Sequence, residues 1–241
     1  MKKLMLTVCL VFGLVIMAAP EVPALTVTID RISGYYSGNG GEFNIVPSSW
    51  VGVGGYNAST LAYNQYNQLG FETFCVETQE YVSIPGTYNA VFNDKAMMGQ
   101  TASGDPISRG TAWLYHEFQI QGDFDNYATY NYTVGADRAA SAAALQATIW
   151  WLEGEAGDPG NLNQFRNAVI TMFTDSATAM LDNSLLPVPY PVGVLNLYSD
   201  SAHTQLAQDQ LYCAVPEPGI LILLGIAMSA IGAASWRIRK L

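Results

Sequence analysis

Two apolar segments at the ends of the 241-residue chain confine the part that can fold in water to the residues between them. At the N-terminus, two lysines precede an uninterrupted stretch of apolar and small residues from Leu4 to Ala18, and residues 22–24 are small enough for a cleavage site. This order is typical of a secretory signal. We therefore predict that residues 1–24 are a signal peptide, recognised by the Sec export machinery and signal peptidase. A retained N-terminal anchor is the alternative, although the apolar stretch is short for a membrane span.

The second apolar segment, residues 219–236, is long enough to cross a bilayer with some local thinning. Three basic residues follow it directly, and basic flanks of a membrane helix stay in the cytoplasm. They are Arg237, Arg239 and Lys240. This order predicts a transmembrane helix that ends in the cytoplasm and holds residues 25–213 outside the inner membrane.

A proline-rich motif, residues 215–218, stands immediately before this helix and contains Pro216, Glu217 and Pro218. Motif, helix and basic cluster (residues 237–240) follow one another in residues 214–241, which resemble the PEP-CTERM sorting signal of Gram-negative bacteria. The resemblance implies that an exosortase-type transpeptidase is a partner and processes the tail near the motif. It also implies that the tether to the inner membrane is an intermediate, with the cell surface or extracellular matrix as the final location. A simple single-pass anchor is the alternative.

The body between the targeting segments, residues 25–213, is long enough for one domain or for one domain with a subdomain. The chain has 20 Asp and Glu against 10 Lys and Arg, so its formal net charge is −10. The basic residues of the body are Arg31, Lys95, Arg109, Arg138 and Arg166. An acidic surface repels nucleic acid, and we therefore expect no nucleic-acid partner.

Hydrophobic periodicity and turn residues predict strands at both ends of the body and helices in its middle. The predicted strands are 25–32, 42–46, 71–76, 86–92, 192–198 and 206–214. The predicted helices are 105–119, 137–153 and 162–181, with Pro106 in the first turn of the first helix and Asp137 as the cap of the second. The expected fold class is α+β: a β-sandwich or barrel with a helical insertion at about residues 105–184.

The sequence motifs of common catalytic, metal and cofactor sites are missing. The two histidines, His116 and His203, lack the spacing of zinc ligands. No phosphate-binding loop, dinucleotide fingerprint or nucleophile elbow occurs. We therefore predict no enzyme, no cofactor and no metal site.

The two cysteines of the body, Cys75 and Cys213, have several possible roles. Exported proteins often join such a pair in a disulfide. Cysteine is also among the most buried residue types, so either thiol could simply pack in the core.

A third role follows from a resemblance to bacterial thioester domains, which are surface adhesin modules with an internal bond between Cys and Gln side chains. Cys75 follows Phe74 and precedes Val76 and Glu77, as in that family, and Gln146 stands before Ile149 and Trp150 on a predicted helix. Leu145 and Thr148 depart from the family pattern. The resemblance implies a thioester between Cys75 and Gln146. We expect apolar side chains to keep water from this bond; these are Phe74, Ile149, Trp150 and Trp151.

Two non-enzymatic functions therefore stand beside each other. In the first, the protein is a covalent adhesin whose thioester captures an amine of a surface protein or a hydroxyl of an exopolysaccharide. In the second, it is a non-reactive structural protein of an exopolysaccharide or biofilm matrix. A hydrolase lacks a supporting set of residues.

Overall fold

The computed structural model describes residues 25–97, 104–120, 122 and 124–214. The predicted signal peptide at residues 1–24 and the sorting motif, membrane helix and basic cluster at residues 215–241 lie outside these ranges. Among the residues described, no helix combines the length and hydropathy needed to cross a membrane.

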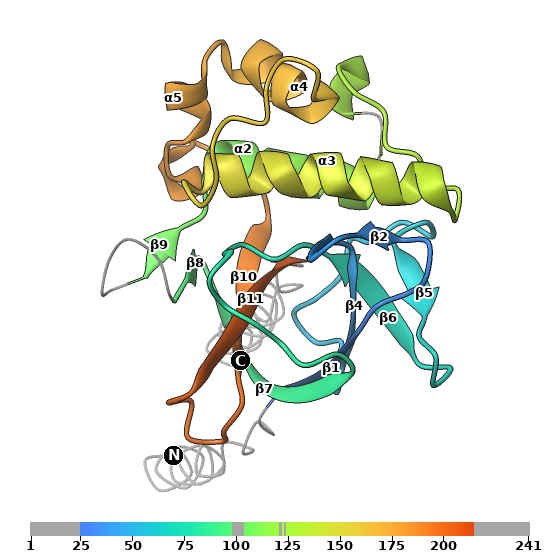
Figure 1. Ribbon diagram of the computed structural model, residues 1–241. Coiled ribbons are helices and arrows are strands. Elements are labelled where there is room, and N and C mark those ends of the chain that lie inside the picture. The colour runs from blue at the N-terminus through green and yellow to red at the C-terminus, as the bar shows by residue number, and fades with distance from the viewer. Residues whose placement is uncertain (1–24, 98–103, 121, 123, 215–241) are drawn as a thin grey trace, which may run out of the picture.

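A seven-stranded antiparallel sheet forms the lower half of the molecule, with the strand order β11-β10-β7-β1-β4-β6-β5 (Figure 1). Its strands are β1 (Thr26–Asp30), β4 (Phe43–Pro47), β5 (Leu61–Tyr63), β6 (Leu69–Thr73), β7 (Gly86–Asn93), β10 (Val192–Tyr198) and β11 (Leu206–Cys213). Strand β1 lies at the centre and pairs with β4 on one side and β7 on the other. Two short ribbons accompany the sheet, β2 (Tyr36–Ser37) with β3 (Gly40–Gly41) and β8 (Lys95–Ala96) with β9 (Asp105–Pro106).

The sheet curls until its β11 edge meets the chain that leaves β6. Cys75 forms an isolated bridge with Gln210. Beside it, Val76 N donates to Asp209 O at 3.1 Å and Leu211 N donates to Phe74 O at 3.0 Å. These contacts hold the two segments together without completing a closed barrel, because β11 and β5 remain the ends of the sheet order.

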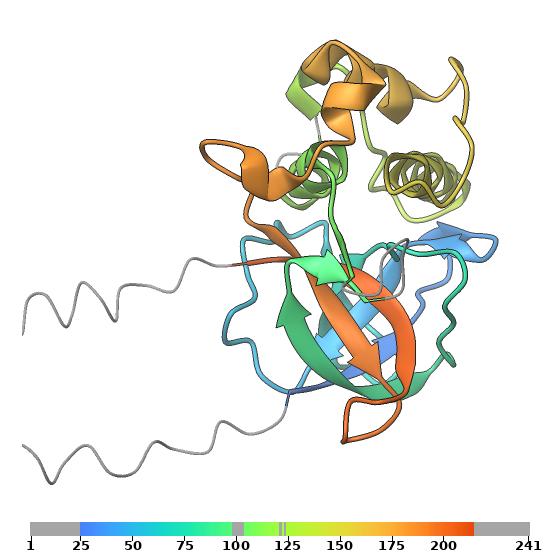
Figure 2. The ribbon, with the colours of Figure 1, turned by 90° about the vertical axis from the view of Figure 1, so that its left-hand side faces the viewer.

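A layer of helices covers one end of the curled sheet. It contains α2 (Arg109–Ile120), α3 (Ala136–Leu152), α4 (Gln164–Phe173), α5 (Ser176–Ala179) and the 3-10 turns η1 (Phe124–Asn126) and η2 (Asn183–Leu185). Figure 2 views α2 and α3 nearly end-on, side by side above the sheet, with α4 further out. The expected mixture of strands and helices is confirmed. The expected sandwich or barrel is wrong. Helices, and not a second large sheet, cover the apolar end of the seven-stranded sheet.

All three predicted helices also differ from the structure in their bounds. Asp105 and Pro106 pair with β8 instead of opening a helix, and α2 begins after Ser108, whose hydroxyl accepts a hydrogen bond from Thr111 N at 3.1 Å. Helix α3 begins after Gly135 with no side-chain cap, so Asp137 is a first-turn residue and not the cap. The third predicted helix is broken at Thr174, whose φ of 74° ends α4 before α5 begins.

Two apolar cores result from this arrangement. One lies between the helices and the sheet and is rich in aromatic residues such as Trp113 and Phe118. The other lies within the curl of the sheet and includes Val27 and Ile29, the inward-facing residues of β1. The segment that follows β6 runs along the boundary, with Phe74 in the first core and Cys75 in the second. This alternation follows from the period of two along an extended chain.

Candidate functional site

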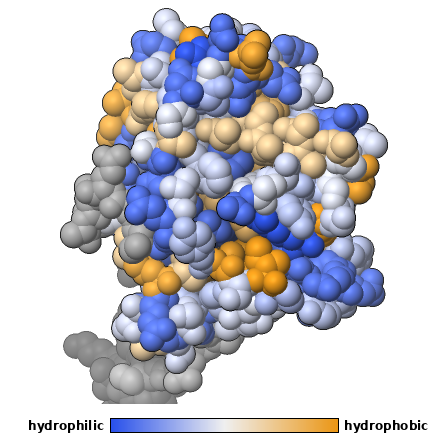
Figure 3. Space-filling model, viewed as in Figure 1, coloured by the Kyte–Doolittle hydropathy of each residue, from blue (hydrophilic) through white to orange (hydrophobic). Residues whose placement is uncertain are grey.

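Gln146 lies in the middle of α3, on the face that the helix turns toward the sheet. Its side chain is 1 % exposed. The outer side of the helix is mostly alanine, and Figure 3 shows a pale orange band of these weakly apolar side chains across the upper part of the molecule. An alanine-rich outer face favours the helix without covering it with large side chains. Gln146 is on the opposite face of the helix, at the boundary between helix and sheet.

Cys75 and Gln146 are in direct contact, although they are 71 residues apart in the sequence. The Cys75 thiol donates to Gln146 Oε1 at 3.4 Å, and Gln146 Nε2 donates back to the Cys75 carbonyl at 2.8 Å. Cys75 is completely buried. The thiol and the carboxamide thus face each other in a site closed to solvent on the cysteine side.

The β2–β3 ribbon supplies a third contact to the same amide. Gly41 N donates to Gln146 Oε1 at 3.3 Å. At the neighbouring Gly40, an added Cβ would lie 2.6 Å from Gln146 Cγ and 2.6 Å from the Trp150 ring. Only glycine lets the ribbon come so close to the helix. The carbonyl oxygen of Gln146 therefore accepts from a thiol and from a backbone N–H, an arrangement that polarises the amide carbon.

The surroundings of Cys75 keep its thiol protonated. Burial raises the pKa of Cys75 to about 12, while the Trp150 side chain and the charge of Arg31 oppose this rise. A protonated thiol is a weak nucleophile.

A cavity of about 650 Å³ opens on the other side of Gln146. Its wall contains Gln146 and Trp150 from α3, Gly40 from the ribbon, Arg31, and the loop residues Tyr81 and Val82. Of the four apolar residues that the sequence places around a thioester, Trp150 lines this cavity. The other three, Phe74, Ile149 and Trp151, do not line the cavity. They pack in the core between helices and sheet, where the ring centres of Phe74 and Phe118 are 5.0 Å apart.

Arg31 is a wall residue that sequence reasoning missed. Its guanidinium lies 4.6 Å from the Tyr36 ring centre and 4.3 Å from that of Phe43. It donates to the carbonyls of Gly38 and Asn39, and so fixes the turn of the β2–β3 ribbon. Its sequence position, just after β1, carries no motif that would have indicated this role.

Cys213 lies away from this site. Both cysteines are free and buried. Cys213 belongs to the core between helices and sheet, whereas Cys75 belongs to the core within the sheet. The disulfide considered as an alternative is therefore not present in the structure.

Comparisons with known proteins bear on the C-terminal tail. A family model described as the PEP-CTERM protein-sorting motif matches residues 214–240. Neither the comparison with curated proteins nor that with solved structures gave a match. The motif is that of an exported precursor, anchored in the membrane before sorting and processed by an exosortase. The chain is therefore a PEP-CTERM domain-containing protein.

Proposed function

We propose that the protein is an exported surface protein that captures a partner covalently through an internal thioester between Cys75 and Gln146. The observation that carries this proposal is the contact between the Cys75 thiol and Gln146 Oε1 at 3.4 Å within a buried site. Two side chains that distant segments hold at this separation need little further movement to react.

The bond would form by acyl transfer within the chain. The Cys75 sulfur adds to the amide carbon of Gln146, and negative charge develops on Oε1, where the Gly41 N–H stabilises it. The C–N bond then breaks, and the thiol proton leaves with the amide nitrogen as ammonia. The products are one thioester and one ammonia, so no cofactor or external energy source is required.

Capture would reverse the roles of the two side chains. A nucleophilic amine or hydroxyl enters from the cavity beside Gln146 and attacks the same acyl carbon. The C–S bond breaks, Cys75 leaves as the thiol, and the proton of the nucleophile neutralises the sulfur. The raised pKa of Cys75 favours this last transfer. Each molecule forms one cross-link to its partner, so the reaction is a single turnover and not catalysis.

The geometry also protects the bond until a partner arrives. Cys75 is fully buried and Gln146 is 1 % exposed, so bulk water does not reach either side chain freely. Trp150 lines the same cavity as Gln146 and is partly exposed. A nucleophile would therefore have to bind in the cavity before it reacts, which gives selectivity. The location that the sorting motif implies makes an amine or hydroxyl of a cell-surface or matrix polymer the class of target.

A change of mass on treatment with methylamine tests this proposal. The exported protein, purified from its producing bacterium, is measured intact before and after exposure to methylamine. An intact thioester gains the mass of one methylamine, because the amine forms an amide at Gln146 and frees Cys75. Comparing the same sample with itself removes any effect of processing at the termini.

Three variants provide the matched comparison. Cys213→Ala removes a buried thiol from the other core and is expected to gain methylamine as the wild type does. Cys75→Ala and Gln146→Glu are expected to gain nothing. If the wild type also gains nothing, and an alkylating reagent labels Cys75 after unfolding, then the contact is inert packing. The non-reactive matrix protein would then be the better description.

A further inference from the structure

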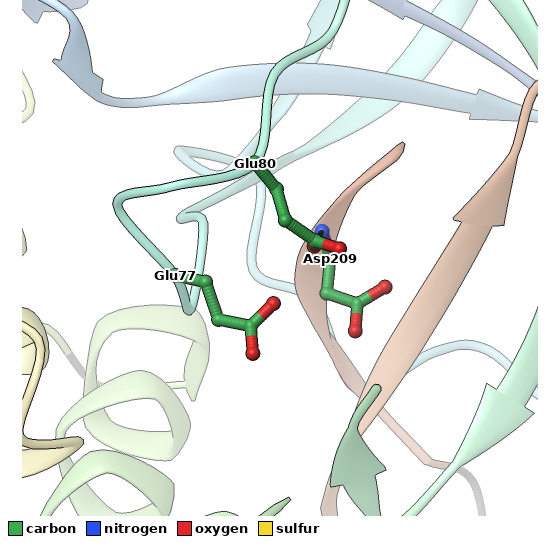
Figure 4. A group of neighbouring side chains, drawn as sticks. All are labelled: Glu77, Glu80 and Asp209. Atoms are coloured by element: carbon green, nitrogen blue, oxygen red, sulfur yellow. Dashed lines mark hydrogen bonds between the residues drawn. The ribbon is translucent and has the colours of Figure 1, made fainter. Parts of the chain in front are cut away.

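Two carboxylates of the loop that follows Cys75 come together with a third that is distant in the sequence. Glu77 and Glu80 belong to this loop, and Asp209 belongs to β11 (Figure 4). One oxygen from each lies within 4.8 Å of the others. Their exposed fractions are 3 %, 5 % and 0 % in that order. So much buried negative charge requires compensation.

Hydrogen bonds compensate only part of this charge. Asp209 accepts from three donors, the backbone N–H groups of Met97 at 2.8 Å and Leu197 at 3.2 Å and the side-chain amide of Asn196 at 2.7 Å. Glu80 Oε2 accepts from Asp209 N at 3.1 Å. Within the described part of the chain, neither oxygen of Glu77 nor Glu80 Oε1 has a hydrogen-bond partner.

Basic side chains do not compensate the charge either. The ion pairs among the described residues involve Glu117, Glu42 and Asp158, and none involves the three clustered carboxylates. Glu77 is thus a buried carboxylate that points into the cluster with both oxygens unpaired. An acceptor in this position calls for a proton or a positive ion.

A cation explains the arrangement better than shared protons do. Desolvation and the neighbouring Glu80 raise the pKa of Glu77 to about 10, so a proton on Glu77 would be one way to neutralise the cluster. Burial and Glu80 raise the pKa of Asp209 to about 7, but its three hydrogen-bond partners all donate to it and oppose protonation, so protons alone are a poor match to this carboxylate. Three convergent carboxylates without nitrogen or sulfur ligands match the preference of calcium for oxygen.

We propose that Glu77, Glu80 and Asp209 form a binding site for one calcium ion. The ion would tie the loop after Cys75 to β11 at the point where Val76 N already donates to Asp209 O at 3.1 Å. It would therefore stiffen the junction that holds Cys75 opposite Gln210. Calcium binding at this site requires the three carboxylates and does not depend on thioester formation.

Calorimetric titration and thermal unfolding of the full-length protein, held in mild detergent because residues 219–236 are apolar, test this site. Titrating calcium chloride into protein stripped with EDTA is expected to show one bound ion per chain. The Tm is expected to rise by several degrees in millimolar calcium relative to EDTA, since an ion that binds only the folded state stabilises it.

Two substitutions of single carboxylates locate the effect. Glu77→Gln keeps the shape of the side chain but removes its charge, and it is expected to weaken calcium binding about tenfold or more. Asp94→Asn removes an exposed carboxylate from the turn between β7 and β8 and is expected to bind like the wild type. The proposal is overturned if the wild type shows neither binding heat nor a Tm shift in millimolar calcium. It is also overturned if Glu77→Gln binds as tightly as the wild type. The wild-type titration decides the matter even if a variant does not fold.

Discussion

At the scale of single residues, Gly40 sets how closely the β2–β3 ribbon approaches helix α3. The backbone there passes close to the Gln146 stem and the Trp150 ring. The neighbouring Gly41 N donates a hydrogen bond to Gln146 Oε1. No sequence pattern marks Gly40 as different from the other 21 glycines, because its importance comes from a neighbour more than a hundred residues away.

Gly40→Ala is expected to push the ribbon and the helix apart. The new Cβ would meet two side chains at 2.6 Å, an overlap that costs about 1–3 kcal/mol of unfolding free energy. It would also reduce methylamine incorporation, because Gln146 loses its position. Gly157→Ala is the control, since a Cβ at Gly157 meets nothing within 4 Å. If urea denaturation finds the two variants equally stable, the close packing at Gly40 does not contribute to the free energy of unfolding.

Burying the ionised form of Glu72 lowers the stability of the folded protein. Glu72 is completely buried, and one of its oxygens has no hydrogen-bond partner among the described residues. Burial and the nearby Glu42 raise its pKa well above the usual 4.5, although Asn44 donates to it at 2.8 Å. Its contribution to stability is therefore complete below about pH 4.5 and is lost as the pH rises through its folded-state pKa.

Glu72→Gln tests this assignment. The variant is expected to be more stable than the wild type at pH 8, by about 1–3 kcal/mol, because it removes an ionisable group that is inadequately paired. At pH 5 the difference is expected to shrink, because Glu72 is then largely protonated in the folded wild type. Denaturant unfolding at the two pH values measures both. A difference that stays constant with pH would contradict the raised pKa.

At the scale of elements, the sequence predicts the strands well and the helix ends poorly. The predicted bounds of β1 and β10 lie within two residues of the structure, β1 through its alternation and β10 as a strand buried along its whole length, whereas the short β5 was not predicted. Pro106 indicates the first turn of a helix, but in the structure it pairs with Lys95 in the β8–β9 ribbon, which no local sequence signal predicts. The third helix was predicted as continuous, although Asn163 and Asp175 each cap a separate helix.

The cap of α4 offers a test at this scale. Asn163 Oδ1 accepts from Phe165 N at 3.0 Å and Arg166 N at 3.2 Å, and its amide donates to Ala144 O of α3 at 2.8 Å. Asn163→Ala is expected to lower the unfolding free energy by about 1–2 kcal/mol through loss of the cap. Asn161→Ala, at an exposed position two residues earlier, is expected to change little. Equal unfolding midpoints in urea would mean that packing alone positions α4.

At the scale of the whole molecule, topology decides which residues meet. The curl of the sheet brings β11 beside the segment after β6, and so places Asp209 next to Glu80 across 129 residues of sequence. Composition and spacing could not show this acidic cluster, because Glu77 and Glu80 lie in the loop after β6 whereas Asp209 lies on β11, 129 residues after Glu80. The contact between Cys75 and Gln146 could not be expected from composition or spacing either, because the two residues are 71 positions apart. The residues that line the cavity could not be read from the sequence, since the face that each aromatic residue presents depends on the curl of the sheet.

The covalent state of Cys75 is the property on which the proposed function rests, and a high-resolution crystal structure of the exported protein measures it most directly. We expect continuous electron density from Cys75 Sγ to the side-chain carbon of Gln146, at bonding distance and with no amide nitrogen. Gly41 N is expected to remain beside the acyl oxygen. Two separate side chains in a protein never exposed to a nucleophile, with the Gln146 amide intact, would contradict the thioester.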